Sequence, residues 1–389
     1  MRAWITGALF CTAVLAGAGA AQAEVRVHVT YLRHEAPPRV VLSNLDPVPA
    51  DLGLAGAQLG RLENATTGRF LNQSFTLDIL SIPAQEDILV PARIALARGD
   101  ILLLDMAASD QTAIADLDPT TLMFNVSDSG DALRGAQCRA NILHSALSAR
   151  MESDALMQVL LSKRWTRLAL MAGPRPDDHS LAQLYRDSAR KFGLKIVDEV
   201  AWTFDTDLRR AANTEVALLT QGLKAHDVLL VADAADDFAR YIPFNTWDPR
   251  PVAGRAGLSA QGWSPAMEQW GAAQLQARFE DLAGRDMAPR DYAAYAAMRS
   301  IGEAVARIQT SDQGRIRDYI LSPDFELAAF QGRPLSYRPW DGQMRQPVPV
   351  ATTRALVASA PLDGFEHARN PLDSLGVDAP ETLCTAFKD

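Results

Sequence analysis

The sequence has few of the residues on which enzyme and metal chemistry usually depend. Its 389 residues include three cysteines and six histidines, and they contain no CxxC pair, no HExxH motif and no GxSxG motif. Without these spacings the chain offers neither a recognisable zinc site nor a serine nucleophile at a strand-to-helix turn. We therefore expect no catalytic residues, no bound metal and no cofactor.

An excess of positive charge is also lacking. The chain carries 38 Lys and Arg residues against 47 Asp and Glu residues, which gives a formal net charge of -9. Nucleic-acid binding needs a concentrated basic surface that neutralises phosphates, so we expect no nucleic-acid partner. The chain has no low-complexity tract and no fixed-period repeat, and this argues against disorder and against a solenoid.

Only one long apolar run is present, at the N-terminus. A short positive start precedes apolar residues 3–20, and Ala-Gln-Ala at 21–23 fits the small-x-small pattern of a cleavage site. We expect a signal peptide over 1–23, cleaved near Ala23, and an exported mature chain; the alternative is a buried N-terminal helix. Cys11 lies inside the run and would be removed with it. No second apolar segment predicts a membrane anchor.

Export leaves two cysteines, Cys138 and Cys384. Thiols tend to pair outside the cytoplasm, so we expect a disulfide between them. It would close a loop of 246 residues (384 minus 138), for which chain entropy gives a stabilisation of about 5 kcal/mol at most. The alternative is two independent buried thiols.

The first part of the chain alternates strands with helices. Apolar or alternating segments bounded by Gly and Ser predict strands, and apolar residues at helical spacing predict helices. The expected strands are 25–32, 75–82, 101–106 and 121–126, and the expected helices are 53–65 and 87–98. This order predicts right-handed βαβ units and an open parallel sheet.

A second series of the same kind follows. The predicted elements are a helix over 153–163, a strand over 167–171, a helix over 180–192, a strand over 195–200, a helix over 214–223, a strand over 227–232 and a helix beginning near 235. The 366 residues left after export (389 minus 23) exceed what one core usually supports. The sequence therefore predicts two α/β lobes.

The last third of the chain changes character. Residues 264–309 have a mostly helical pattern, whereas 325–334 and 348–357 look like antiparallel strands separated by a turn at 340–342. A return to extended structure after the second lobe implies that the chain crosses between the lobes more than once. Several crossings make a hinge.

Residues 56–68, 138–145, 291–298 and 330–347 form four segments. Together they resemble the type I periplasmic binding proteins of ABC importers, in the leucine/isoleucine/valine-binding branch. Residues 56–68 look like the first helix and glycine turn of that branch, and 291–298 look like the first-lobe helix after the second crossing. Residues 138–145 and 330–347 look like the subfamily associated with alcohol oxidation systems dependent on pyrroloquinoline quinone (PQQ).

This resemblance implies an α/β fold with two doubly wound parallel-sheet lobes joined by three crossings. The crossings are expected near 144–150, 254–264 and 322–330. Lobe 1 would comprise 24–145 and 262–325, lobe 2 would comprise 146–261 and 326–360, and a C-terminal tail would comprise 361–389.

The resemblance also implies a function. A small molecule would bind between the lobes of a periplasmic monomer, and the closed form would meet an ABC permease at the inner membrane. Closure follows from population shift, because the ligand contacts both lobes only in the closed state. The alternatives are a protein that presents its ligand to a membrane receptor, and a periplasmic enzyme.

Candidate ligand-binding residues of lobe 1 follow two strands, since ligands of open α/β sheets bind beyond the carboxyl ends of the strands. These candidates are Ser109, Asp110, Ser127 and Asp128. The alternative is that they only cap helices. Because Asp105 and Asp110 flank Ser109, a ligand carboxylate would be repelled. A neutral compound derived from an alcohol, or a cation, would meet less opposition.

Candidates of lobe 2 lie in its strand-end loops and beyond them. They are Asp178, His179, Asp233, Trp247 and Trp263. Tryptophan rings can enclose a flat ligand, but each Trp is alternatively a core residue. Asp178 and His179 are alternatively part of a solvated loop.

Two further charged groups have simple explanations. Asp236 and Asp237, close to Asp233, match no calcium loop and more simply open a helix. The arginines Arg333, Arg338 and Arg345 could bind an anion such as the quinone cofactor, but we expect a solvated face of a hairpin.

Overall fold

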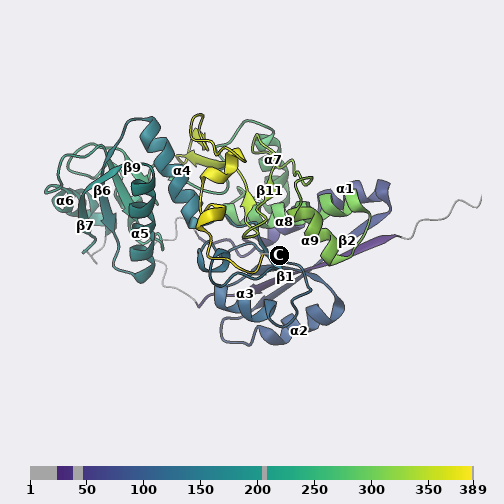
Figure 1. Ribbon diagram of the computed structural model, residues 1–389. Coiled ribbons are helices and arrows are strands. Elements are labelled where there is room, and N and C mark those ends of the chain that lie inside the picture. The colour runs from purple at the N-terminus through teal and green to yellow at the C-terminus, as the bar shows by residue number, and fades with distance from the viewer. Residues whose placement is uncertain (1–23, 38–46, 204–207, 388–389) are drawn as a thin grey trace, which may run out of the picture.

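The computed structural model describes residues 24–37, 47–203 and 208–387. Within them the chain forms two α/β lobes side by side, and the C-terminal part of the chain lies between them (Figure 1). The predicted signal peptide, residues 1–23, lies outside the described residues. No helix in the described part of the chain is long and apolar enough to cross a membrane.

The first lobe is built on a parallel sheet with the strand order β2-β1-β3-β4-β5. Its strands are β1 (Val25–His34), β2 (Gln73–Ile82), β3 (Ile101–Asp105), β4 (Met123–Asn125) and β5 (Ile142–His144). The residues of β3 are buried on both faces of the sheet, as the purely apolar run predicts. Ile101 and Leu103 belong to the core on one face, and Leu102 and Leu104 belong to the core on the other.

Helices cover both faces of this sheet. On one face lie α1 (Leu54–Leu71), α7 (Ala272–Ala283), α8 (Pro289–Ile308) and α9 (Gln313–Leu321), and on the other lie α2 (Leu89–Arg98) and α3 (Ala108–Ala115). The helices α1 and α8 pack very closely, because Gly56 and Gly60 have no side chain to keep α8 away.

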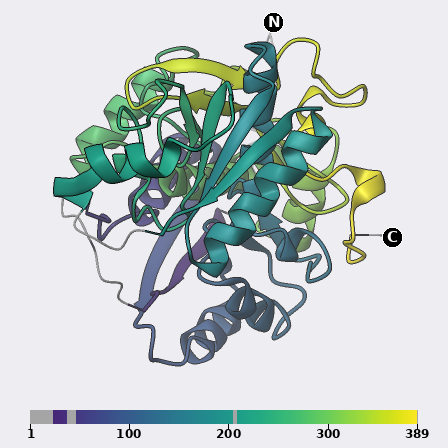
Figure 2. The same cartoon turned by 90° about the vertical axis from the view of Figure 1, so that its left-hand side faces the viewer.

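The second lobe repeats this plan with the strand order β7-β6-β8-β9, again parallel. Its strands are β6 (Arg167–Ala172), β7 (Lys195–Ala201), β8 (Val228–Ala232) and β9 (Val252–Gly254). The helices α4 (Ala149–Ser162) and α5 (Pro176–Lys191) cover one face, and α6 (Leu208–Thr220) with the 3-10 turn η2 (Ala239–Tyr241) covers the other. Figure 2 shows this sheet in teal, with helices on either side.

Two small antiparallel units contribute to the two cores, the first to the core of the second lobe and the second to the core of the first lobe. The strands β10 (Ser259–Ala260), β13 (Val348–Ala351) and β14 (Leu356–Ala360) form a sheet that packs against α4. The strands β11 (Ser336–Tyr337) and β12 (Met344–Arg345) form a hairpin. Three further 3-10 turns are η1 (Ala132–Arg134), η3 (Pro371–Ser374) and η4 (Ala379–Glu381).

The prediction of a helix beginning near 235 is wrong. After β8 the chain turns, and only the short turn η2 follows. The carboxylate of Asp233 accepts hydrogen bonds from the backbone N–H groups of Phe238 (2.7 Å) and Ala239 (2.8 Å). This side chain offers the backbone an alternative to a helix, so Asp236 and Asp237 do not open one.

The hairpin of the last third is also placed differently. Residues 325–334 form no strand apart from a single bridge between Leu327 and Leu335. The turn near 340–342 instead joins β11 to β12. Phe325, Leu327 and Ala329 are buried in the first core, so the apolar pattern of this range reflects burial and not sheet pairing.

Core membership locates the crossings between the lobes. Ala146 belongs to the first core and Leu147 to the second, and Ala260 belongs to the second core whereas Trp263 belongs to the first. The first core also includes residues between 325 and 344, and the second core resumes at Val348. We therefore propose that the third crossing lies at 345–347, later in the chain than the range 322–330 that the sequence suggested.

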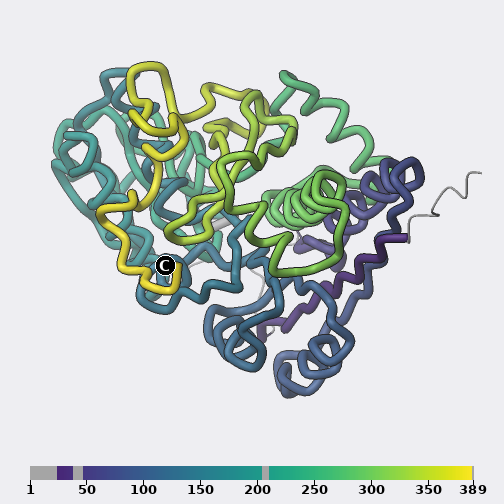
Figure 3. The backbone as a smooth tube through the Cα atoms, turned by 45° about the vertical axis from the view of Figure 1, so that its right-hand side comes forward, coloured from purple at the N-terminus to yellow at the C-terminus, as the bar shows by residue number. Residues whose placement is uncertain are grey.

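The C-terminal segment, residues 361–387, contacts both lobes. The backbone N–H of Gly376 donates to the Asp154 carboxylate of α4 (2.9 Å), and Leu375 is part of the second core. Farther along, Cys384 forms the predicted disulfide with Cys138 of the first lobe. Figure 3 shows this segment in yellow, running from the teal lobe to the blue loops of the other.

The arginines near the hairpin do not form the expected solvated face. Arg338 is fully buried, and its Nε lies 3.1 Å from the Asp373 carboxylate of the C-terminal segment. Arg345 is half-buried and pairs with the same carboxylate at 2.7 Å. Arg333 pairs with Glu366 at 2.7 Å. These arginines hold the C-terminal segment in place.

Candidate binding cleft between the lobes

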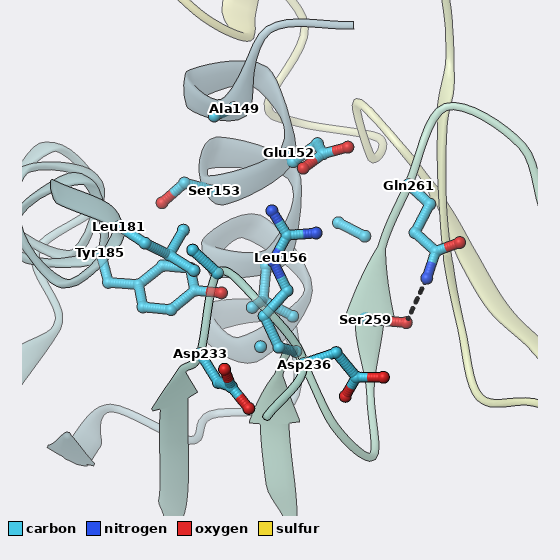
Figure 4. A pocket seen from close by; sticks show the side chains of 14 residues that line it. Ala149, Glu152, Ser153, Leu156, Leu181, Tyr185, Asp233, Asp236, Ser259 and Gln261 are labelled. Carbon is cyan, nitrogen blue, oxygen red and sulfur yellow. Dashed lines mark hydrogen bonds between the residues drawn. The ribbon is translucent and has the colours of Figure 1, made fainter. Parts of the chain in front are cut away.

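Two cavities lie at the carboxyl ends of the strands, where ligands of open α/β sheets bind. The lobe-2 cavity, about 240 Å³, is lined by Glu152, Ser153, Tyr185, Asp233, Asp236, Arg255 and Ser259 together with apolar residues (Figure 4). The inter-lobe cavity, about 290 Å³, is lined by Ser127, Ser129 and Ser145 from lobe 1, by Arg290 and Tyr292 of α8, and by Gln346. Glu152 and Arg255 line both, so we treat them as one cleft.

The lobe-1 rim of the cleft is ordered by Asn125, the last residue of β4. Its side-chain oxygen accepts from the backbone N–H groups of Ser127 (3.2 Å) and Asp128 (2.9 Å), and its amide group donates to the carbonyl of Asp128 (2.8 Å). The hydroxyl of Ser127 accepts from the backbone N–H of Met106 (3.1 Å). The loop that faces the cleft is therefore fixed by a fully buried amide.

A second buried side chain, Arg134, links this rim to the crossings. Its guanidinium donates to the carbonyls of Gly130 (2.7 Å) and Ala146 (2.8 Å) and to the side chain of Gln343. Gln343 in turn donates to the carbonyls of His144 (3.3 Å) and Ala146 (3.2 Å). Burial lowers the pKa of His144 well below its usual value, helped by the nearby Arg134 charge. That histidine is therefore neutral and acts as a structural residue.

On the lobe-2 side, polar groups without partners face the cavity. Asp233 is fully buried, and its Oδ1 has no hydrogen-bond partner in the part of the chain that the structure describes, whereas its Oδ2 accepts from two backbone N–H groups. The hydroxyl of Tyr185 makes no hydrogen bond within the described residues, and burial raises its pKa to about 12. Buried polar groups are rarely left without partners, so this pair marks a place where a ligand group can bind.

Two opposite charges stand where the cavities meet. Glu152 lies in the first turn of α4, and Arg255 follows β9 directly. Neither side chain forms a hydrogen bond or an ion pair with any residue that the structure describes. Burial raises the pKa of Glu152, and the Arg255 charge opposes this effect. The pKa of Arg255 is raised by Glu152 and the other acids of the cavity against the effect of burial, so it stays charged.

The acids near Ser109 are neutralised by neighbours. The Asp105 carboxylate accepts from Tyr31 (2.9 Å) and Arg33 (2.9 Å) and lies 3.4 Å from Arg290. Asp110 lies 2.7 Å from His34. The expected repulsion of a ligand carboxylate at this edge of the sheet is therefore weaker than the sequence suggested.

Of the sequence-predicted lobe-1 candidates, Ser127 lines the cleft. Ser109 is exposed on α3, where it caps nothing, and its carbonyl accepts from Thr112 (2.9 Å). Asp110 pairs with His34 as described. Asp128 accepts from the backbone N–H of Gly130 (3.0 Å), so it orders the rim loop and starts no helix.

Of the lobe-2 candidates, Asp233 lines the cleft. Asp178 is buried in the first turn of α5, where it accepts from the backbone N–H groups of Arg175 (3.0 Å) and Ala234 (2.7 Å). His179 is exposed on the same helix. Trp247 is exposed beside the end of α6, and its backbone N–H donates to the Thr220 hydroxyl (2.8 Å). Trp263 is fully buried and stacks on Tyr292 with ring centroids 4.8 Å apart.

Sequence reasoning missed several residues of the cleft. Glu152, Tyr185 and Arg255 were not among the candidates, although the position of Arg255 directly after a strand was a usable signal. Glu152 and Tyr185 lie on helices and reach the cleft only through the packing of α4 and α5. Among the described residues, no group of three His, Cys, Asp or Glu side chains could hold a metal ion.

Known structures share this architecture. A periplasmic ligand-binding protein of a branched-chain amino acid ABC transporter from Burkholderia xenovorans LB400 superposes with a TM-score of 0.70 at 17% identity, over 94% of this chain and 100% of that chain. The chain has the type I periplasmic binding protein fold. No protein-family model matches the sequence, and no curated protein sequence matches it.

Two further structures with this fold differ in what they bind. The leucine-, isoleucine-, valine-, threonine- and alanine-binding protein from Brucella ovis, in its closed conformation, has a TM-score of 0.64 at 13% identity, over 93% of this chain and 97% of that chain. A solute-binding protein of an ABC transporter from R. palustris, in complex with benzoate, has a TM-score of 0.62 at 10% identity, over 93% of this chain and 99% of that chain. One binding-protein fold thus accommodates different ligands, so the ligand must be inferred from the residues of the cleft.

Proposed function

We propose that this protein is the periplasmic solute-binding component of an ABC importer and captures a small molecule between its lobes without chemical conversion. The observation that carries the proposal is the cleft itself, which residues of both lobes line and in which Glu152, Arg255 and Asp233 Oδ1 have no hydrogen-bond partner among the described residues. A ligand that bridges Ser127 of lobe 1 and Asp233 of lobe 2 would favour the closed state, because both contacts form only there.

The test combines identification of the solute with transport. Protein isolated gently from periplasm is denatured, and the released small molecules are identified by mass spectrometry. We expect one solute that stabilises the refolded protein in a thermal-shift assay, that remains unchanged on long incubation and whose uptake by cells requires the gene. Conversion of the solute to a product would support an enzyme, and unchanged uptake in a deletion strain would contradict an importer component.

The link to PQQ-dependent alcohol oxidation is a separate hypothesis that rests on residues 138–145 and 330–347. Many residues of these segments have scaffold roles: Cys138 forms the disulfide, and Arg338 anchors the C-terminal segment. Ser145 and Gln346 line the cleft. Growth of a deletion strain on alcohols tests the link, and we expect a defect on an alcohol but none on succinate. Equal growth on both would contradict it.

A further inference from the structure

The lobe-2 cavity carries more negative than positive charge. Among the described residues, the acids that line it are Glu152, Asp233 and Asp236, and the one cation is Arg255. Asp236 is paired with Arg240 at 2.8 Å. Of the remaining charges, Arg255 offsets one of the two carboxylates, Glu152 and Asp233. One negative charge is left without a counterion in the described structure.

Two acceptors of this cavity, Asp233 Oδ1 and the Glu152 carboxylate, have no hydrogen-bond donor among the described residues. The two carboxylates lie on opposite sides of the cavity, Glu152 on α4 and Asp233 at the end of β8, as the sticks in Figure 4 show. Asp233 Oδ1 has no partner within residues 24–37, 47–203 and 208–387, although the side chain is fully buried. The Tyr185 hydroxyl, on a side chain that is 4% exposed, points into the same space. A buried carboxylate oxygen without a donor is costly, and a ligand that carries a donor can satisfy it.

We propose that the lobe-2 cavity binds a protonated nitrogen of the ligand between Glu152 and Asp233, so that the captured solute is an amine or a guanidine. The inference rests on the proposed function and adds the chemical class of the ligand. An ammonium group supplies up to three donors and one positive charge, which matches the acceptors and the uncompensated charge. A neutral alcohol of the same length leaves the charge unbalanced.

The test compares amines with alcohols of matched length. Binding of putrescine and of 1,4-butanediol to the purified full-length mature protein, freed of solute, is measured by calorimetry, together with ethanolamine, lysine, arginine and leucine. We expect at least one amine to bind with a dissociation constant below about 1 mM, and we expect 1,4-butanediol to bind about tenfold or more weakly than putrescine. A comparison of the affinities of lysine and arginine with that of leucine shows whether a side-chain cation or an α-ammonium group enters the cavity.

Variants tie the result to this cavity. Glu152→Gln removes one carboxylate that makes no hydrogen bond or ion pair within the described residues, and it should weaken amine binding by about tenfold or more with little change in melting temperature. Asp233→Asn should act in the same direction but also perturb the turn after β8. Asp177→Asn, on an exposed side chain of α5, is the matched control and should leave binding unchanged.

Three outcomes would overturn the inference: no amine binds, matched alcohols bind equally well, or Glu152→Gln leaves amine affinity unchanged. The proposed function would fail differently. If the co-purified solute lacks a basic nitrogen and its uptake still requires the gene, the importer assignment stands and only the ligand class is wrong.

Discussion

At the scale of single residues, Asp154 has a central structural role. It is fully buried on α4, and its carboxylate accepts from Ser188 (2.5 Å), from the Lys191 ammonium (2.6 Å) and from the backbone N–H of Gly376 (2.9 Å). One side chain therefore joins two helices of the second lobe to the C-terminal segment. Buried charges of this kind are tolerated only when all their hydrogen bonds are made.

We expect Asp154→Ala to lower the free energy of unfolding by about 3 to 5 kcal/mol, because it leaves the Lys191 charge and the Gly376 N–H without an acceptor. Equilibrium unfolding in urea measures the change. Asp187→Ala removes a partly exposed acid that pairs with Arg190 and accepts from Gln183 within α5, and it should cost less than about 1 kcal/mol. An equal loss in the free energy of unfolding for both variants would contradict the prediction, because the buried carboxylate would then contribute no more than a surface one.

At the scale of helices and strands, the sequence predicted the two parallel sheets well. The apolar run of β3 and the alternating pattern of β1 are set by burial on the sheet. Gly193 follows the C-terminal end of α5 with a φ of 73°, a conformation that favours glycine. These are local signals. The helix expected near 235 was predicted wrongly because the Asp233 side chain binds the backbone N–H groups that follow it.

The cleft was harder to predict than the sheets. Ser127 and Asp233 could be found because each lies in a loop directly after a strand. Glu152 reaches the cleft from α4, which begins directly after the first crossing, so its place depends on how the chain passes between the lobes. Trp263 was a reasonable aromatic candidate, but its ring packs on Tyr292 inside the first core. No pattern along the chain distinguishes these cases.

The contact between α1 and α8 supports a prediction at the same scale. A Cβ atom on Gly56 would lie 1.9 Å from the backbone oxygen of Asp291, so a side chain there must push the helices apart. We expect Gly56→Ala to destabilise the protein by about 3 kcal/mol, as measured by thermal and urea unfolding. Gly222→Ala, at a position with open space around it, is the control. A Gly56 variant as stable as that control would contradict the close packing.

At the scale of the whole molecule, the disulfide closes a loop of 246 residues that includes the entire second sheet. Replacing both Cys138 and Cys384 with Ser should lower the free energy of unfolding by about 2 to 5 kcal/mol. Urea unfolding of the native protein with and without a thiol reductant gives the same comparison without mutation. The reductant should not change the free energy of unfolding of the double variant. A native protein that is equally stable in both states would contradict the prediction.

The C-terminal segment has a practical consequence for following the protein in solution. Its contacts pass from Gly376 on the second lobe to Cys384 on the first, and Pro380 lies exposed between them. A change in the angle between the lobes must alter the surroundings of that stretch, which is remote in sequence from the lining of both cavities. A fluorophore attached at position 380 would turn the molecule into a biosensor, whose emission records occupancy of the cleft without a label near the solute.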